Sequence, residues 1–189
     1  MQIPAEEFLR AHPDSWISRR APEFPVVNVH ARDVAAPPAR VFAALADHGN
    51  LSPAWYWRVL LAVRGLVGKL FRWDPGVKWR GPEPLVPGNH YAFFLIEHVA
   101  APGPDAQPPV APPYELGVSV ENRLTLALMS YWIVPSGAGS CVYNVTCALF
   151  KGRTGRAYWR VIRPFHDALI EDMLNSLCSR AERAGHSML

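Results

Sequence analysis

The chain has 189 residues, of which 50% are hydrophobic and 19% are charged, and its formal net charge is +3. This length supports one well-buried core, so we expect a single globular domain. The basic residues are dispersed along the chain, which argues against nucleic-acid binding. The longest apolar run, residues 59–71, contains Arg64 and Lys69 and is too short to cross a bilayer, so we expect no stable membrane insertion.

Cysteine usage and the N-terminus bear on the compartment. Cys141, Cys147 and Cys178 form neither an even set for disulfides nor a Cys-x-x-Cys metal pair. The first residues lack the continuous apolar core of a signal peptide. These features predict a reducing, cytoplasmic location.

The chain begins with residues 1–25, a short helical segment from Pro4 to Ala11 followed by several prolines, which we interpret as a surface arm. Residues 26–34 alternate in a way that predicts a strand, with Val27, Val29 and Ala31 on one face and Asn28, His30 and Arg32 on the other. Two helices are predicted next, at residues 36–47 and 55–71, from prolines suited to a first helical turn. We expect an arm (1–25), one domain (26–184) and a tail (185–189).

Five further strands are predicted between turn residues, at residues 77–85, 89–99, 114–121, 124–134 and 140–151. Their connections are mostly short, which favours an antiparallel meander. The exception, residues 101–113, holds six prolines and no periodicity, and we interpret it as a stiff linker loop.

The last run, residues 156–183, predicts one long amphipathic helix with a bend at Pro164. Its inward side is expected to carry Tyr158, Ile162, Phe165, Leu169, Met173, Leu177 and Ala181. A curved antiparallel sheet of about six strands, wrapped on this helix with two shorter helices after the first strand, is an α+β fold. Such a fold leaves a cavity between sheet and helix.

Four pieces of the chain carry a resemblance to known proteins: His12–Ser15, Pro53–Gly65, Glu121–Leu126 and, most specifically, the Arg-Pro-Phe-His sequence at Arg163–His166. The chain resembles the helix-grip superfamily, which includes START domains, plant pathogenesis-related allergens and polyketide cyclases. Within it, the chain is most similar to a family of uncharacterised bacterial domains. The resemblance implies a START-like fold over roughly residues 12–182, but no single activity, because helix-grip domains serve many functions.

The candidate binding residues lie on elements that should line the cavity. His166 can hydrogen-bond a ligand or transfer a proton there, although a packed structural histidine is the alternative. The other candidates are large apolar side chains: Trp57, Phe94, Trp132, Tyr143 and Ile162. Arg163 and the turn at Glu121–Arg123 are also weighed as ligand contacts, with surface and turn roles favoured for them.

Three functions follow from these residues. The first is binding of a small hydrophobic or amphipathic molecule without catalysis, and with no cofactor or metal, since nucleotide motifs and metal-ligand spacings are missing from the sequence. The second is a cyclase- or dehydratase-like enzyme with His166 as general acid or base. The third is an interaction module whose cavity its own aromatics fill. The sequence also leaves a homodimer as an alternative, because strand 124–134 is apolar on both faces and a loop or second subunit must cover one of them.

Overall fold

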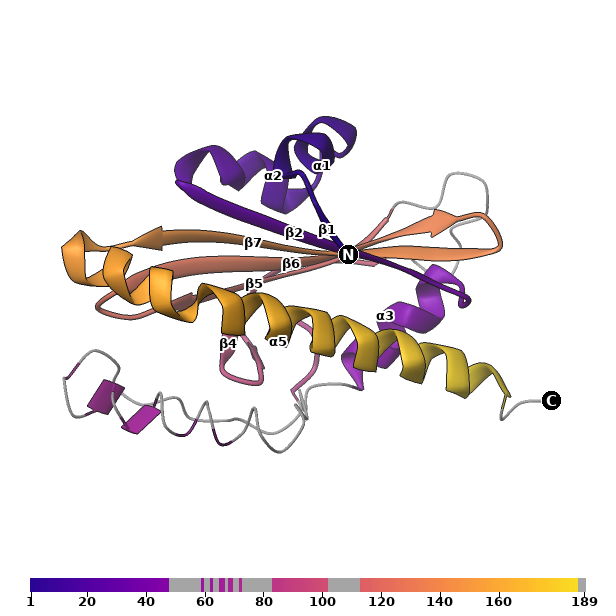
Figure 1. The fold of residues 1–189 in the computed structure, drawn as a ribbon. Coiled ribbons are helices and arrows are strands. Elements are labelled where there is room, and N and C mark those ends of the chain that lie inside the picture. The colour runs from indigo at the N-terminus through magenta and orange to yellow at the C-terminus, as the bar shows by residue number, and fades with distance from the viewer. Residues whose placement is uncertain are drawn as a thin grey trace.

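The computed structural model describes residues 1–47, 83–101 and 113–186, together with single residues and pairs between 59 and 72. Most of the predicted second helix, the predicted strand 77–85 and the predicted loop 101–113 lie outside the described residues. The described elements form one seven-stranded antiparallel sheet in the order β1-β2-β7-β6-β5-β4-β3. Short helices from the N-terminal residues lie on one face of this sheet, and a long C-terminal helix lies on the other together with one more short helix (Figure 1).

The strands are β1 (Gln2–Ile3), β2 (Val26–Val34), β3 (His90–Tyr91), β4 (Phe94–Ala100), β5 (Tyr114–Glu121), β6 (Thr125–Ser136) and β7 (Gly139–Phe150). Four predicted strands agree with β2, β5, β6 and β7 to within two residues. The strand predicted at 89–99 is instead the hairpin of β3 and β4. Ala92 takes a left-handed backbone conformation there, with φ of 58°, and turns the chain back on itself.

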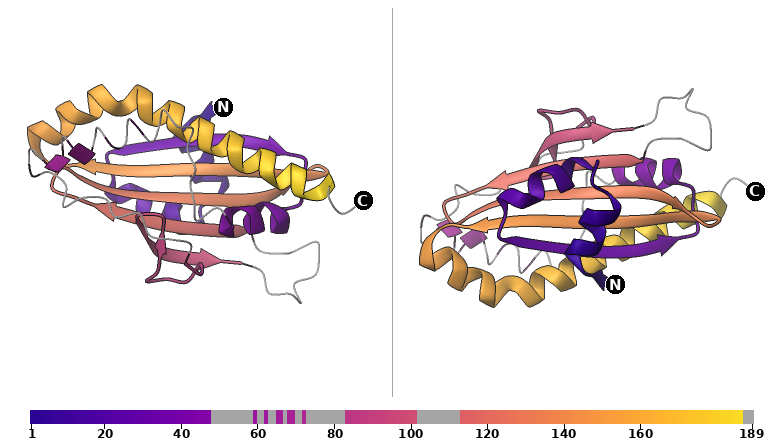
Figure 2. Two further views of the ribbon diagram at one scale, coloured as in Figure 1. Left: turned by 90° about the horizontal axis from the view of Figure 1, so that it is seen from below. Right: turned by 90° about the horizontal axis from the view of Figure 1, so that it is seen from above.

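The helices are α1 (Ala5–Ala11), α2 (Trp16–Arg20), the 3₁₀ helix η1 (Ala21–Glu23), α3 (Pro38–Ala46) and α5 (Gly152–His186). In Figure 1, α1 and α2 lie above the sheet, and α3 and α5 lie below it. We call the upper side of the sheet the outer face and the lower side the helix face. Pro164 lies inside α5 as predicted, and Figure 2 shows this helix curved.

Within the first 25 residues, β1 joins the edge of the sheet, and α1, α2 and η1 pack as a layer on the outer face. Phe8 and Ile17 are buried against β2, β6 and β7, in a core completed by Ala21, Phe24, Val29, Leu128, Trp132, Val145 and Cys147. The carboxylate of Glu115 accepts hydrogen bonds from the backbone N–H groups of Trp16 (2.9 Å) and Ile17 (3.3 Å), and so fixes the start of α2. The division of the chain into arm, domain and tail stays a prediction.

The helix face holds the larger core. Ile170, Leu174, Leu177, Cys178 and Ala181 of α5 pack with apolar residues of β4 to β7, among them Ile96, Leu116, Val118, Met129, Ile133 and Val142. The predicted inward side was right for Leu177 and Ala181 and wrong for Phe165, which is 55% exposed. The reason is visible in Figure 2: the first half of α5 runs beside the edge of the sheet and not across it.

Candidate functional site

Polar side chains of the helix face gather on β2 and β7. His30 of β2 lies opposite Asn144 of β7, which in turn lies opposite Tyr131 of β6. Directly opposed residues of antiparallel strands share a face. The next row across the same face consists of Asn28 of β2, Thr146 of β7, Met129 of β6 and Val118 of β5. The helix face is therefore polar at the β2 edge and apolar from β6 onward, apart from the tyrosine hydroxyls.

His30 is the most enclosed member of this cluster. Its side chain is 2% exposed, and neither ring nitrogen has a hydrogen-bond partner among the described residues. Two carboxylates of α5 face it: Asp167 lies 3.9 Å from Nε2 and Glu171 lies 3.9 Å from Nδ1. These separations exceed a hydrogen bond. Burial lowers the pKa of His30, although both carboxylates oppose this, so the imidazole is neutral near pH 7.

Asp167 ties α5 to the sheet. Its Oδ1 accepts a hydrogen bond of 2.9 Å from the amide of Asn28 and lies 3.3 Å from His166 Nδ1. The His166 ring packs edge-on against Trp159, with centroids 5.2 Å apart. Burial lowers the pKa of His166, and Asp167 opposes the shift. Arg163 lies 3.8 Å from Asp167 Oδ2 and is exposed, consistent with the surface role favoured for it.

Unpaired buried atoms mark where the site is incomplete. Among the described residues, five buried side-chain polar atoms have no hydrogen-bond partner: His30 Nδ1 and Nε2, Tyr91 Oη, Trp132 Nε1 and Asn144 Nδ2. All except the Trp132 nitrogen belong to residues of the helix face. A buried polar atom left unpaired costs about 1–3 kcal/mol. Four such atoms on one face indicate a place where a further partner is expected.

Burial also sets the state of the tyrosines. It raises the pKa of both Tyr91 and Tyr131, and the Asn144 side chain partly opposes the shift at Tyr131. Tyr91 and Tyr131 lie close enough for a charge on one to disfavour a charge on the other. Both hydroxyls are therefore protonated at neutral pH and able to donate a hydrogen bond.

The structure separates the predicted site residues into groups. His166 and Ile162 lie one turn apart on α5 and are half-buried. Phe94 is half-buried at the edge of the helix-face core, stacked on Phe93 with centroids 4.1 Å apart. Trp57 lies outside the described residues.

Trp132 and Tyr143 are on the outer face, away from the other candidates. The ring of His12 lies 5.7 Å from Trp132 and 5.2 Å from Tyr143, centroid to centroid, beneath the N-terminal layer. The strand of Trp132 is apolar on both faces, so the sequence alone did not show which face Trp132, and Tyr143 opposite it on β7, would take.

The residues that sequence reasoning did not select are His30, Asn144 and Tyr91. The available signal was a polar side chain in the middle of an apolar strand, as at His30 in Val29-His30-Ala31 and Asn144 in Tyr143-Asn144-Val145. Such a residue is costly to bury without a partner. Pairing of β2 with β7, which places the two side by side, is a long-range contact that local patterns do not reveal.

Other features of the described chain are structural. Asn122 Oδ1 accepts hydrogen bonds from the backbone of Leu124 (2.8 Å) and Thr125 (2.9 Å), so the Glu121–Arg123 segment forms the turn that was favoured for it. In the part of the chain that the structure describes, no three His, Cys, Asp or Glu side chains form a metal-binding group. No described helix is long and apolar enough to cross a membrane.

The described fold, an antiparallel sheet with a long C-terminal helix packed on one face, is that of an α+β helix-grip protein. Residues 20–173 match the family model described as "Protein of unknown function (DUF2867)". The chain therefore belongs to this family, in agreement with the resemblance to uncharacterised domains. Comparison with curated protein sequences gave no match.

Three solved structures are similar to this chain only in outline. A norcoclaurine synthase point mutant of Thalictrum flavum is 12% identical, with a TM-score of 0.44 over 85% of this chain and 96% of that one. A protein of Thermus thermophilus is 15% identical, with a TM-score of 0.43 over 84% and 99%. The di-domain ARO/CYC StfQ of the steffimycin biosynthetic pathway is 13% identical, with a TM-score of 0.42 over 96% and 60%. Likenesses at this level carry no argument about function.

Proposed function

We propose that the protein binds a small amphipathic molecule between the helix face and α5, with a polar group of that molecule at His30 and Asn144. The observation that supports this most is the set of unpaired buried atoms on the helix face. A folded domain rarely leaves such atoms without a partner. A bound molecule would supply the missing hydrogen bonds.

The chemistry of the unpaired atoms selects the kind of polar group. Asn144 Nδ2 is a donor, while a neutral His30 donates through one nitrogen and accepts through the other. A hydroxyl group both donates and accepts, so it suits this pair. An anionic group is disfavoured, since the carboxylates of Asp167 and Glu171 lie 3.9 Å from the same ring.

The apolar part of the molecule would lie toward Met129 and Val118, which continue the second row across the sheet. Burying about 300 Å² of apolar ligand surface gives on the order of 7 kcal/mol before the cost of immobilisation. That is sufficient for a carrier or a sensor. The predicted binding residues His166, Ile162, Phe94 and Trp57 stay part of this proposal.

Mass spectrometry of an organic extract from the purified protein tests the proposal. We expect a small molecule bearing a hydroxyl group in extracts of the wild type and less of it, by about tenfold, in extracts of His30→Leu. His90→Leu, on the β3 edge, is the matched control and should retain the molecule. An extract of the wild type that contains no small molecule would contradict the proposal and favour a domain without a ligand.

A second candidate function is proton transfer by His166. The observation that favours it is the carboxylate of Asp167, 3.3 Å from His166 Nδ1, which can orient the ring as a general base. Under this hypothesis His166→Gln would retain the extracted molecule but lose its conversion, as followed by mass spectrometry over time. If the molecule changes at the same rate with His166→Gln as with the wild type, His166 does not catalyse its conversion, and ligand binding remains as the proposed function.

A further inference from the structure

The first half of α5 exposes a strip of apolar side chains to solvent. Val161 is 68% exposed and Phe165 is 55% exposed. Ala157, Pro164 and Ala168 are exposed as well. At 3.6 residues per turn these five residues fall along one strip of the helix. Exposed large apolar side chains that lie next to each other mark a surface for contact with another body.

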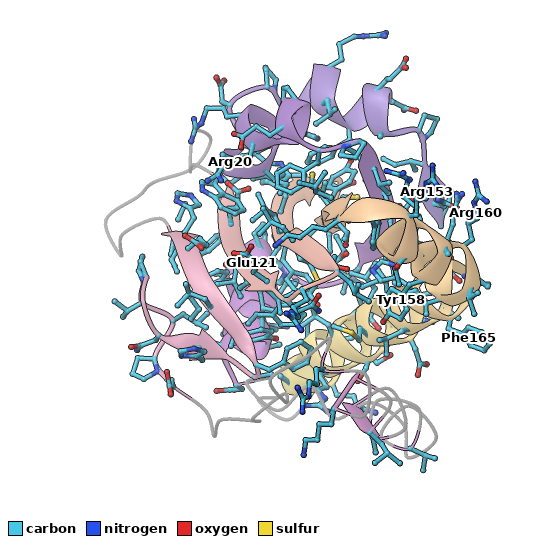
Figure 3. The ribbon with its side chains drawn as sticks, turned by 90° about the vertical axis from the view of Figure 1, so that its left-hand side faces the viewer. Arg20, Glu121, Arg153, Tyr158, Arg160 and Phe165 are labelled. Carbon is cyan, nitrogen blue, oxygen red and sulfur yellow. The ribbon has the colours of Figure 1, made fainter. Side chains whose placement is uncertain are left out.

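A row of arginines runs beside this apolar strip. Arg153, Arg156, Arg160 and Arg163 recur at steps of three and four residues, and all are exposed. The sequence has no acidic residue from Gly152 to His166. Within the described part of the chain, Arg163 lies near Asp167, while the other three form no ion pair. Figure 3 shows Arg153, Arg160 and Phe165 projecting outward from α5.

This combination fits one partner better than others. A symmetric second copy would bring two arginine rows together, and their like charges would repel. A nucleic acid would use the arginines but would leave the Val161–Phe165 strip without a partner. An anionic lipid surface offers negative headgroups for the arginines and an acyl boundary for the apolar side chains.

We propose that the first half of α5 docks on an anionic lipid surface. Phe165 and Val161 enter the boundary between headgroups and acyl chains, while the arginine side chains extend their apolar stems along it and place their guanidinium groups among the headgroups. The contact is peripheral and reversible. It uses other side chains than the ligand proposed at His30: Val161, Phe165 and the arginines are exposed, whereas Asp167 and Glu171 are the α5 residues that face His30.

Co-sedimentation of the full chain with vesicles tests this docking. We expect binding to phosphatidylcholine vesicles that contain about one third phosphatidylserine, little binding to phosphatidylcholine alone, and release by high salt. The double variant Arg156→Glu with Arg160→Glu should weaken binding at least roughly tenfold. Phe165→Ser should weaken it less. Arg10→Glu, an exposed arginine on α1 at the outer face, is the matched control and should bind as the wild type does.

Several results would overturn the proposal: no sedimentation of the wild type with phosphatidylserine vesicles, equal sedimentation with both vesicle types, or an equal loss in Arg10→Glu. Arginine-dependent binding to duplex DNA without binding to vesicles would replace the lipid surface by a nucleic acid. The lipid and salt dependence of the wild type decides the matter even if a variant fails to fold.

Discussion

On the outer face of the sheet the buried carboxylate of Glu115 accepts hydrogen bonds from two backbone N–H groups of α2 and from Ser130, whereas on the helix face the buried imidazole of His30 has no such bond. Both side chains are almost completely buried. The contrast separates a polar group that holds the fold together from one that is available to a further molecule. Substitutions on the two faces should therefore change stability in opposite directions.

Loss of the Glu115 carboxylate should have the largest effect. Glu115→Ala leaves the N–H groups of Trp16 and Ile17 without their acceptor beneath the N-terminal layer, and we expect the free energy of unfolding to fall by about 3 kcal/mol. Urea unfolding measures it. Glu97→Gln, whose side chain bonds Ser119 at the surface, is the control and should change stability by less than about 0.5 kcal/mol. A small effect of Glu115→Ala would mean that the N-terminal layer is not held by this carboxylate.

Gly117→Ala should cause the next largest loss in the free energy of unfolding. A Cβ atom at this position would lie 2.6 Å from the ring of Trp16, which packs directly on the glycine. We expect a loss of about 2 kcal/mol. The loss should shrink in a Trp16→Leu background, where the ring is absent, and a double-mutant cycle by urea unfolding measures this coupling. Additive effects would show that ring and glycine are not in contact.

His30→Leu should change stability little, or raise it by up to about 1 kcal/mol, in protein freed of bound molecules. The reason is that it replaces an unpaired buried polar group by an apolar side chain. Urea unfolding before and after organic extraction measures both states. A loss above about 2 kcal/mol in the extracted protein would show that His30 is paired and structural.

The smallest effect concerns pH. Burial lowers the pKa of His30 and His166 below the ordinary value of 6.5, so the unfolded chain binds more protons in this range. Above pH 6.5 both rings are neutral in the folded and the unfolded chain, and this contribution to stability is fully present. It is lost as the pH falls from 6.5 toward the lowered pKa values of the folded protein. Asp167, Glu171 and the N-terminal ammonium face His30, and the two carboxylates moderate its shift.

When the pH is lowered from about 7 to about 5.5, we therefore expect the free energy of unfolding of His30→Leu to fall by about 0.5 kcal/mol less than that of the wild type. Parallel urea titrations at the two pH values measure the difference. The same pH dependence in both proteins would assign the titration to other groups.

Local patterns predicted the fold because its elements are locally encoded. Alternation between turn residues located β2 and β5, and apolar periodicity located α5. The inward position predicted for Phe165 was wrong, because periodicity shows that a helix has an apolar side but not where the sheet beneath it ends. Similarly, β6 is apolar on both faces, so the sequence could not assign Trp132, or Tyr143 opposite it on β7, to a face.

The candidate site was less predictable than the fold. His166 was selected because it lies on the helix next to the sheet, which the sequence shows. His30 and Asn144 become neighbours only when β2 pairs with β7, and their lack of partners is a property of the assembled interior. Residues 1–25 were not expected to form a layer, since the contact of Glu115 with Trp16 spans 99 positions of the chain.

A crystal structure of the protein purified without added ligand tests the central claim most directly. We predict density for a small molecule within hydrogen-bonding distance of a His30 ring nitrogen and of Asn144 Nδ2, with its apolar part toward Met129. Density for protein alone, with His30 bonded directly to Asp167 or Glu171 and Asn144 paired with Tyr131, would contradict the claim.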